Sequence, residues 1–301
     1  YLHQPFVDHS SSEMDFEFLF PAEYLETVTC SSRYADVCPD AQHGCVSGKA
    51  IFQLQNTSGT EQNIRFSIDP GYQIASVQAN GKDIPFSVEE YQAMGSKRFA
   101  VTIPADPEIE LAVDYGGFPQ EWNISSTEQG RAEISDVYMC LENTQLSPSP
   151  FDVYYQGESL PAVMDITLPG HMTPLLFGSG SAELLRSNEN GMKTWRMTDE
   201  GYNMILYAGD YIQEEIPVES AGITVNFYYS RKHQSIMKDM NAAEMIRQTI
   251  AYCTEHIGPL SFYGDGTFNL IESRTSGGGY AGDGASLADE LDFAMQNLSN
   301  G

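Results

Sequence analysis

The chain has 301 residues, of which 41% are hydrophobic, and its 42 acidic and 15 basic side chains give a formal net charge of −27. This composition is globular and excludes a disordered chain, and the length suffices for two domains. The charge argues against nucleic acid and anionic lipid as partners, because binding to phosphates requires clustered Lys and Arg, which the sequence lacks. We interpret the acidity as a solvated surface that maintains solubility, with electrostatic steering of a cationic ligand as the alternative.

The ends of the chain indicate part of a longer protein. The sequence begins at Tyr1, and it contains neither a signal peptide nor an apolar run of about eighteen residues that could cross a membrane. We therefore expect a fragment, whose parent can still carry a membrane segment.

The five cysteines are Cys30, Cys38, Cys45, Cys140 and Cys253. The first three lie in a short stretch rich in Ser, Asp and Gly, but their spacing, even with His43 nearby, matches no short zinc knuckle. In an oxidising compartment we expect a disulfide between two of these three, without a choice of pair, and at least one free thiol. The other two lie in apolar surroundings and are predicted to be buried. The cysteines thus favour an extracytoplasmic location.

Residues from about 46 to 230 are predicted to form mainly β structure. Apolar and polar residues alternate, as in half-buried strands, over residues 46–54, 64–68, 99–103 and 109–115. Asn80-Gly81 separates two further apolar runs, and this dipeptide favours a two-residue hairpin because both turn positions need positive φ. Short strands with turns at this spacing predict an antiparallel sandwich or curved sheet.

The pattern changes after Tyr229. Apolar residues from Ile236 to Ile257 recur at steps of three and four, which predicts one amphipathic helix that ends at Gly258-Pro259. A strand over residues 267–271 follows, and then a glycine-rich loop begins at Ser276.

The change of pattern divides the chain into two parts. Residues 1–230 are predicted to form an N-terminal β domain, and residues 231–301 the truncated start of a second domain. The expected fold class is therefore mainly β with an α+β C-terminal part.

The glycine-rich loop is a candidate binding site. Glycines permit positive φ and let backbone groups approach a ligand closely, so a loop directly after a strand can pair with an extended peptide as an added edge strand. An ordinary connector is the alternative. The loop matches neither a P-loop nor a dinucleotide fingerprint, because it lacks Gly-Lys-Ser/Thr and no helix starts within it. The sequence also contains no His-Glu-x-x-His, and we assign no catalytic or metal-binding residue.

Eight segments, in this order and spacing, resemble the M1 family of zinc aminopeptidases. They are Pro150-Phe151-Asp152, residues 164–170, 178–180, 193–195, 207–211 and 222–229, the amphipathic helix with its end at residues 256–260, and the strand at residues 269–273. The resemblance covers residues from about 140 to 290. It implies a saddle-like N-terminal β domain that leads into the start of a metallopeptidase-like catalytic domain.

The resemblance also implies site residues. The family's Gly-x-Met-Glu-Asn loop corresponds to Gly278-Gly279-Tyr280-Ala281-Gly282, so Gly278, Gly279, Tyr280 and Ala281 are the expected substrate-binding residues. Ala281 replaces the family's glutamate, which holds the free amino group of the substrate. A second amine-binding position falls in Thr144-Gln145-Leu146-Ser147, where Gln145 is the candidate and no acid is present. Because a desolvated ammonium group needs carboxylates nearby, the resemblance does not extend to aminopeptidase specificity.

The family's zinc motif would lie just past Gly301. The resemblance therefore implies no cofactor in this chain and zinc in the full-length parent. We expect a fragment of an M1-like zinc metallopeptidase that is inactive alone and holds a peptide as an edge strand on the backbone of residues 278–281. The net charge suggests that this peptide is neutral or cationic.

The glycine-rich form of the loop is also similar to M1-like domains on the outer face of bacterial ABC-type permease proteins. This implies an extracytoplasmic domain whose parent is membrane-anchored or fused to a permease. A non-catalytic binding or scaffold domain of a membrane transporter is the alternative, because both acidic amine-binding positions are lost. A carbohydrate-binding sandwich is a third hypothesis, which 17 tyrosines permit without favouring it.

Overall fold

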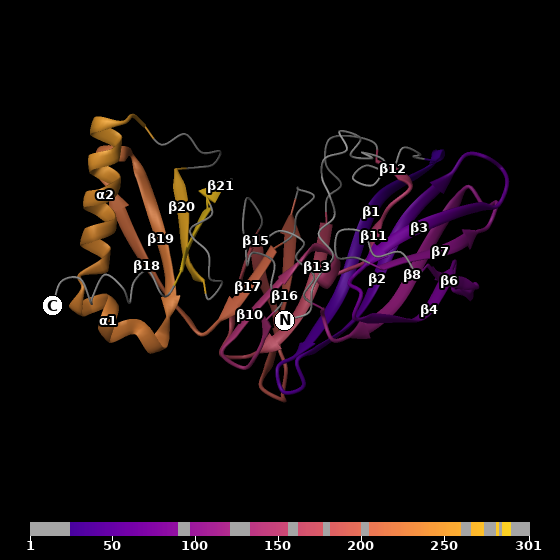
Figure 1. The fold of residues 1–301 in the computed structure, drawn as a ribbon, viewed down its shortest axis with the longest axis horizontal. Coiled ribbons are helices and arrows are strands. Elements are labelled where there is room, and N and C mark those ends of the chain that lie inside the picture. The colour runs from indigo at the N-terminus through magenta and orange to yellow at the C-terminus, as the bar shows by residue number, and fades with distance from the viewer. Residues whose placement is uncertain are drawn as a thin grey trace, which may run out of the picture.

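The computed structural model describes residues 25–89, 97–120, 133–155, 162–176, 181–199, 205–259, 266–273, 281–282 and 285–289. In this part of the chain, three sheets pack around one core to form the N-terminal part, and a fourth sheet with two helices forms the C-terminal part (Figure 1). The mainly β fold with an α+β C-terminal part is confirmed.

The largest sheet has nine strands and runs in the order β15-β16-β13-β1-β2-β8-β4-β5, with β12 beside β1. Its strands are β1 (Leu25–Asp40), β2 (Cys45–Asn56), β4 (Tyr72–Ala79), β5 (Lys82–Asp83), β8 (Glu108–Gly117), β12 (Val153–Tyr155), β13 (Ala162–Pro169), β15 (Ser181–Ser187) and β16 (Met192–Asp199). β1 pairs antiparallel with β2 but parallel with β13, which joins the early and late halves of the sheet.

Two four-stranded sheets complete the N-terminal part. One runs β11-β3-β7-β6 and consists of β3 (Gln62–Ile68), β6 (Phe86–Glu89), β7 (Lys97–Ile103) and β11 (Ser149–Pro150). The other runs β14-β17-β10-β9 and consists of β9 (Glu133–Ile134), β10 (Tyr138–Glu142), β14 (Thr173–Leu176) and β17 (Ile205–Gly209). The strands predicted from alternation correspond to β2, β3, β7 and β8, and they are confirmed.

The expected hairpin at Asn80-Gly81 is also present. These two residues connect β4 to β5, and their φ angles are 51° and 74°. Both lie in the left-handed region that this turn requires, so the dipeptide predicted the local geometry correctly.

Aromatic residues hold the large sheet against the second sheet. Phe52 of β2 contacts Phe66 of β3 with ring centroids 5.0 Å apart, and Phe66 stacks on Phe99 of β7 at 5.2 Å. All three side chains are fully buried. Burial of side chains of this size stabilises the fold by about 1.5 to 3 kcal/mol each.

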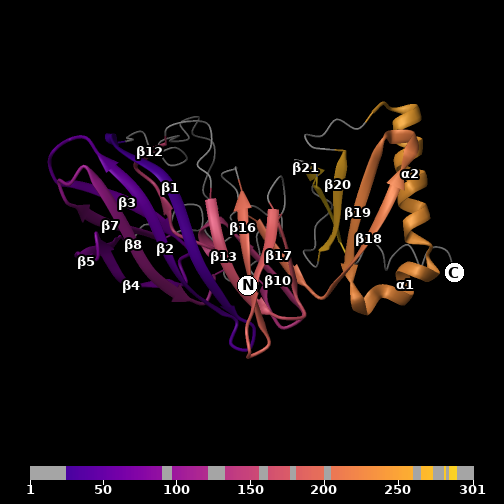
Figure 2. The ribbon, with the colours of Figure 1, turned by 180° about the vertical axis from the view of Figure 1, so that it is seen from behind.

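The C-terminal sheet has five strands in the order β18-β19-β20-β22-β21. They are β18 (Tyr211–Val218), β19 (Ile223–Ser230), β20 (Thr267–Ser273), β21 (Ala281–Gly282) and β22 (Ala285–Asp289). β19, β20 and β22 are parallel, and β18 and β21 run antiparallel to their neighbours. Helix α2 (Ala242–His256) lies along the side of this sheet that faces away from the N-terminal part (Figures 1 and 2).

The predicted single helix is in fact two helices, so that prediction was wrong. α1 (Gln234–Asp239) and α2 are separated at Asn241, whose φ of 52° lies in the left-handed region. Asn tolerates this conformation better than most residues because its short polar side chain bonds locally. The apolar steps continue across the break, and periodicity therefore does not reveal it.

In the described residues the C-terminal sheet begins with β18 at Tyr211, whereas the sequence predicts a domain boundary at about residue 230, which stays a prediction. β19 pairs with β20 over Thr224–Tyr228, so β18 and β19 share a sheet with the C-terminal strands. The sequence placed these two strands with the N-terminal part because alternation reports burial of a strand and not its pairing partner.

None of the helices in the described part of the chain is long and apolar enough to cross a membrane.

Candidate functional site

The strand that carries Ala281 lies at the end of the C-terminal sheet. Ala281 and Gly282 form β21, where they pair with Ser286 and Ala285 of β22, and β21 is last in the strand order. A terminal strand offers the N–H and C=O groups of its outer edge to an extended partner. Gly278, Gly279 and Tyr280, the other expected residues of this loop, lie outside the described residues.

Gln145 belongs to the N-terminal part and is only 8% exposed. It ends the short turn η2 (Asn143–Gln145), where its side-chain Oε1 accepts a hydrogen bond of 2.9 Å from the backbone N–H of Glu142. Its backbone carbonyl accepts a 2.5 Å bond from the hydroxyl of Tyr72. Gln145 thus stabilises the turn itself, and its expected contact with a substrate stays a prediction.

Glu272 fixes the base of the loop, and sequence reasoning missed it. Its carboxylate is 4% exposed: Oε2 accepts a 2.6 Å bond from the backbone N–H of Ser230, and Oε1 lies 2.6 Å from Nδ1 of His233. The hydroxyl of Tyr211 donates to the backbone carbonyl of Glu272 at 3.3 Å. One residue of β20 therefore contacts β18, β19 and the turn before α1. An acidic residue at the end of an apolar strand was the available signal.

The next residue along connects the two parts of the molecule. Ser273 is 1% exposed, and its Oγ lies 3.4 Å from the hydroxyl of Tyr138 in β10. Tyr138 also belongs to a buried cluster with Cys140, Tyr207, Tyr211 and Ile271, which brings β10 and β17 together with the C-terminal sheet. Burial raises the pKa of the Tyr207 and Tyr211 hydroxyls, which keeps them neutral hydrogen-bond donors.

A polar cavity of about 270 Å³ lies at this junction. It is lined by Val137, Tyr138, Gly209, Asp210, Tyr211, Ser230, Lys232, His233 and Glu272. Asp210 forms a 2.9 Å ion pair with Arg231, and Glu272 is bound as described above. Both carboxylates therefore already have partners, Arg231 for Asp210 and His233 for Glu272.

The described residues do not fit a zinc ion. No three His, Cys, Asp or Glu side chains come together there in a way that could hold a metal.

The five cysteines are free thiols, so the expected disulfide is not formed. Cys30 is 1% exposed, and burial raises the pKa of its thiol to about 12. Across the hairpin, Cys38 lies opposite Ser47, and Cys45 opposite Asp40, so neither has a directly facing cysteine. Cys140 is buried as predicted, whereas Cys253 is only half-buried.

Comparison with known proteins gives the fold. No protein-family model and no curated protein matches the chain. One similar solved structure is an M1 zinc metallopeptidase mutant from Deinococcus radiodurans bound to a Tyr-Ser-Ala substrate. The two sequences are 15% identical, and the alignment covers 89% of this chain and 61% of the Deinococcus chain, with a TM-score of 0.54. A two-domain M1 zinc metallopeptidase mutant bound to L-arginine is 14% identical, covers 90% and 62%, and also scores 0.54.

Native yeast LTA4 hydrolase is similar as well, with 11% identity, coverage of 88% of this chain and 41% of its own, and a TM-score of 0.55. At these identities the likeness establishes the M1 fold alone. The chain spans 61% of the length of the Deinococcus protein.

Proposed function

We propose that this chain is part of an M1-like zinc metallopeptidase and supplies a peptide-binding surface, while the zinc ligands come from residues outside positions 1–301. The observation that carries the proposal is the position of β21 at the end of a five-stranded sheet in an M1 fold. An extended peptide would add to Ala281-Gly282 as a sixth strand and exchange backbone hydrogen bonds with it.

Neither expected amine-binding position holds an acid, and we therefore expect little preference for a peptide with a free N-terminus. Ala281 occupies the position where the resemblance places the family's glutamate, and the side chain of Gln145 accepts a hydrogen bond from the backbone N–H of Glu142. A peptide held mainly through its backbone depends on its N–H groups, and its side chains and terminus contribute less.

The test uses residues 1–301 and a fluorescent basic heptapeptide in four forms: unmodified, N-acetylated, N-methylated at alternate backbone nitrogens on one edge, and N-methylated on the other edge. We expect the acetylated form to bind within about twofold of the unmodified one. One of the two N-methylated forms should bind at least about tenfold more weakly, a loss of about 1.4 kcal/mol. Equal binding of both N-methylated forms, or no binding at all, would contradict strand addition.

A second measurement tests the zinc part of the proposal. Purified residues 1–301 should not cleave peptides when zinc is added, and zinc-dependent cleavage by this chain would show that its ligands lie within it. A non-catalytic binding domain of a membrane transporter remains the alternative function, and the alanine at position 281 favours it. In the parent, His-Glu-x-x-His and a later Glu after Gly301 would favour the enzyme. An extracytoplasmic location stays a prediction.

A further inference from the structure

The C-terminal sheet carries an apolar groove beside helix α2. Its volume is about 270 Å³. Met245, Ile246 and Ile250 of α2 line one side of the groove, and Phe268 and Leu270 of β20 line the other. Helix α2 lies on the side of the sheet that faces away from the N-terminal part, so the groove is separate from the junction cavity (Figures 1 and 2).

Helix α2 covers this face of the sheet only in part. Under it, Ile216 of β18 and Phe227 of β19 are buried to 1% and 0% exposure. Leu270 of β20 is paired with Phe227, so both side chains point to the same face, yet Leu270 is only half-buried. Met245, on the groove side of α2, is 42% exposed. The apolar face of the sheet therefore continues beyond the edge of the helix that packs on it.

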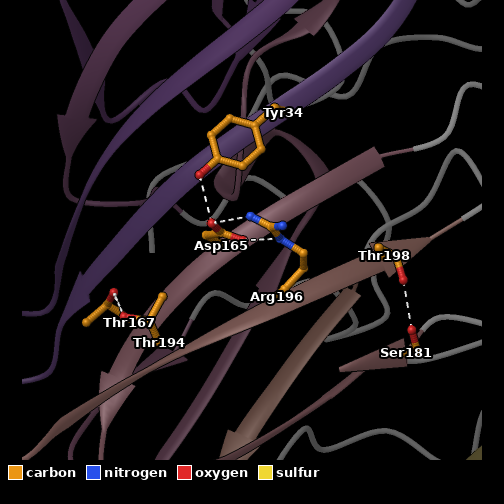
Figure 3. A network of polar contacts seen from close by, with 7 residues as sticks. All are labelled: Tyr34, Asp165, Thr167, Ser181, Thr194, Arg196 and Thr198. Carbon is orange, nitrogen blue, oxygen red and sulfur yellow. Dashed lines mark hydrogen bonds and ion pairs between the residues drawn. The ribbon is translucent and has the colours of Figure 1, made fainter. Parts of the chain in front are cut away.

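The large sheet shows how this protein builds a sheet face that meets water. One face of β13 carries the core residues Met164, Ile166 and Leu168. The opposite face carries polar side chains that bond to one another (Figure 3): Asp165 with Arg196 and Tyr34, Thr167 with Thr194, and across the neighbouring strands Ser181 with Thr198. Apolar surface left in water costs free energy in proportion to its area. The apolar groove at β20 thus indicates a surface that a further segment covers.

The chain leaves the C-terminal sheet beside this groove. β22 lies next to β20 and runs parallel to it, and residues 290–301, which lie outside the described residues, follow β22 directly. Helix α2 likewise follows the turn at the end of β19, which is also parallel to β20. A segment that turns back over the same face after β22 would therefore run beside α2 and in the same direction, along the groove.

The sequence of residues 290–301 has the pattern of a short amphipathic helix. Leu291, Ala294, Met295 and Leu298 recur at steps of three and four and so form one apolar stripe. Asp289, which precedes the segment, is a preferred N-cap residue. A helix over residues 290–301 would be about 18 Å long, close to the length of about 20 Å for a seven-residue strand such as β20.

We propose that residues 290–301 form a helix that packs into this groove through Leu291, Met295 and Leu298. This helix completes the layer over β20, and it holds β22 against the sheet from one face. β22 in turn pairs with β21, the candidate peptide-binding strand. The proposal concerns packing of the chain on itself, so it can fail or succeed independently of peptide binding.

Hydrogen exchange in residues 1–301 tests the packing. Leu291→Ser and Leu298→Ser together remove the ends of the stripe, so the amides of residues 267–273 should exchange at least about tenfold faster. The matched control is Phe293→Ser, an apolar residue off the stripe, which should change this exchange less than about twofold. Unchanged exchange in β2 and β8 reports that the N-terminal part stays folded. A change below about twofold in the double variant, or equal acceleration by Phe293→Ser, overturns the proposal.

A cross-link identifies what occupies the groove and leaves both leucines in place. A short bismaleimide should join Met245→Cys to Met295→Cys within one chain, with the linked peptides identified by mass spectrometry because native thiols also react. Met245→Cys with Phe293→Cys is the control and should yield at least about tenfold less of its link. A link between two chains would show that a second copy fills the groove. That result, or equal yields from the two pairs, or no link between position 245 and position 295, overturns the proposal.

Discussion

Removal of the Glu272 carboxylate should loosen the C-terminal sheet where the candidate binding loop begins. In Glu272→Ala, the backbone N–H of Ser230 loses an acceptor at 2.6 Å, and His233 loses its partner at 2.6 Å. The alanine also leaves space in a place where the native side chain is 4% exposed.

The expected loss is about 2 to 4 kcal/mol of local stability. A hydrogen bond from a partly buried N–H to a carboxylate contributes about 1.5 to 3 kcal/mol, and most of that is lost because the N–H of Ser230 is left without this acceptor. The contact with His233 adds about 0 to 1 kcal/mol, because the histidine side chain is 31% exposed and solvent screens the pair. Glu272→Gln keeps an oxygen acceptor and should lose about half as much.

Hydrogen exchange followed by mass spectrometry measures this effect where it arises. Amides in residues 223–230 should exchange about 30- to 1000-fold faster in Glu272→Ala, since each 1.4 kcal/mol corresponds to a factor of ten. The control is Glu215→Ala, an exposed acidic residue of β18, which should change exchange less than about threefold. A change of that small size in Glu272→Ala as well, or equal acceleration throughout the N-terminal sheets, would refute the reasoning.

Two further predictions concern the N-terminal part. Gly117→Ala should cost at least about 2 kcal/mol in urea unfolding, because φ is +151° and a Cβ would lie 2.3 Å from the carbonyl oxygen of Gly71. Gly59→Ala, with positive φ but open space, should cost about 1 to 2 kcal/mol, and an equal or larger loss there would contradict the clash. Asp165→Asn should destabilise at neutral pH. The hydrogen bonds from Arg196 lower the pKa of Asp165, so its contribution is full above the ordinary value of 3.8 and is lost as pH falls through the lower folded value. The gap in urea midpoint should thus close below that pH, and a constant gap down to pH ~2 would count against it.

Local patterns predicted the strands because alternation and turn chemistry act over a few residues. The turn at Asn80-Gly81 depends only on its own φ angles, and its geometry was predictable. The parallel pairing of β1 with β13 was not, because Tyr34 and Asp165 are 131 residues apart and their contact depends on packing of the whole sheet. The break between the two helices at Asn241 was not predicted either, although it is a local feature, because the apolar residues keep their helical spacing across it.

The residues of the candidate binding loop also differ in how far the sequence alone predicts them. A glycine-rich loop after a strand, together with the family resemblance, predicted a peptide-binding edge near Ala281. In the described residues β21 is last in the strand order, and its contact with a peptide stays a prediction. The role of Glu272 depends on Ser230 and His233, which reach it only after β19 and β20 pair. In the sequence, Glu272 is an acidic residue at the end of an apolar strand, and its hydrogen-bond partners can be identified only from the folded structure.

The strongly acidic composition should help a basic peptide to reach the edge strand β21. A net charge of −27 attracts such a peptide, and salt weakens that attraction over a Debye length of about 8 to 10 Å. Salt should therefore weaken binding of a basic peptide, and an affinity that does not change with salt would contradict electrostatic attraction by the acidic surface.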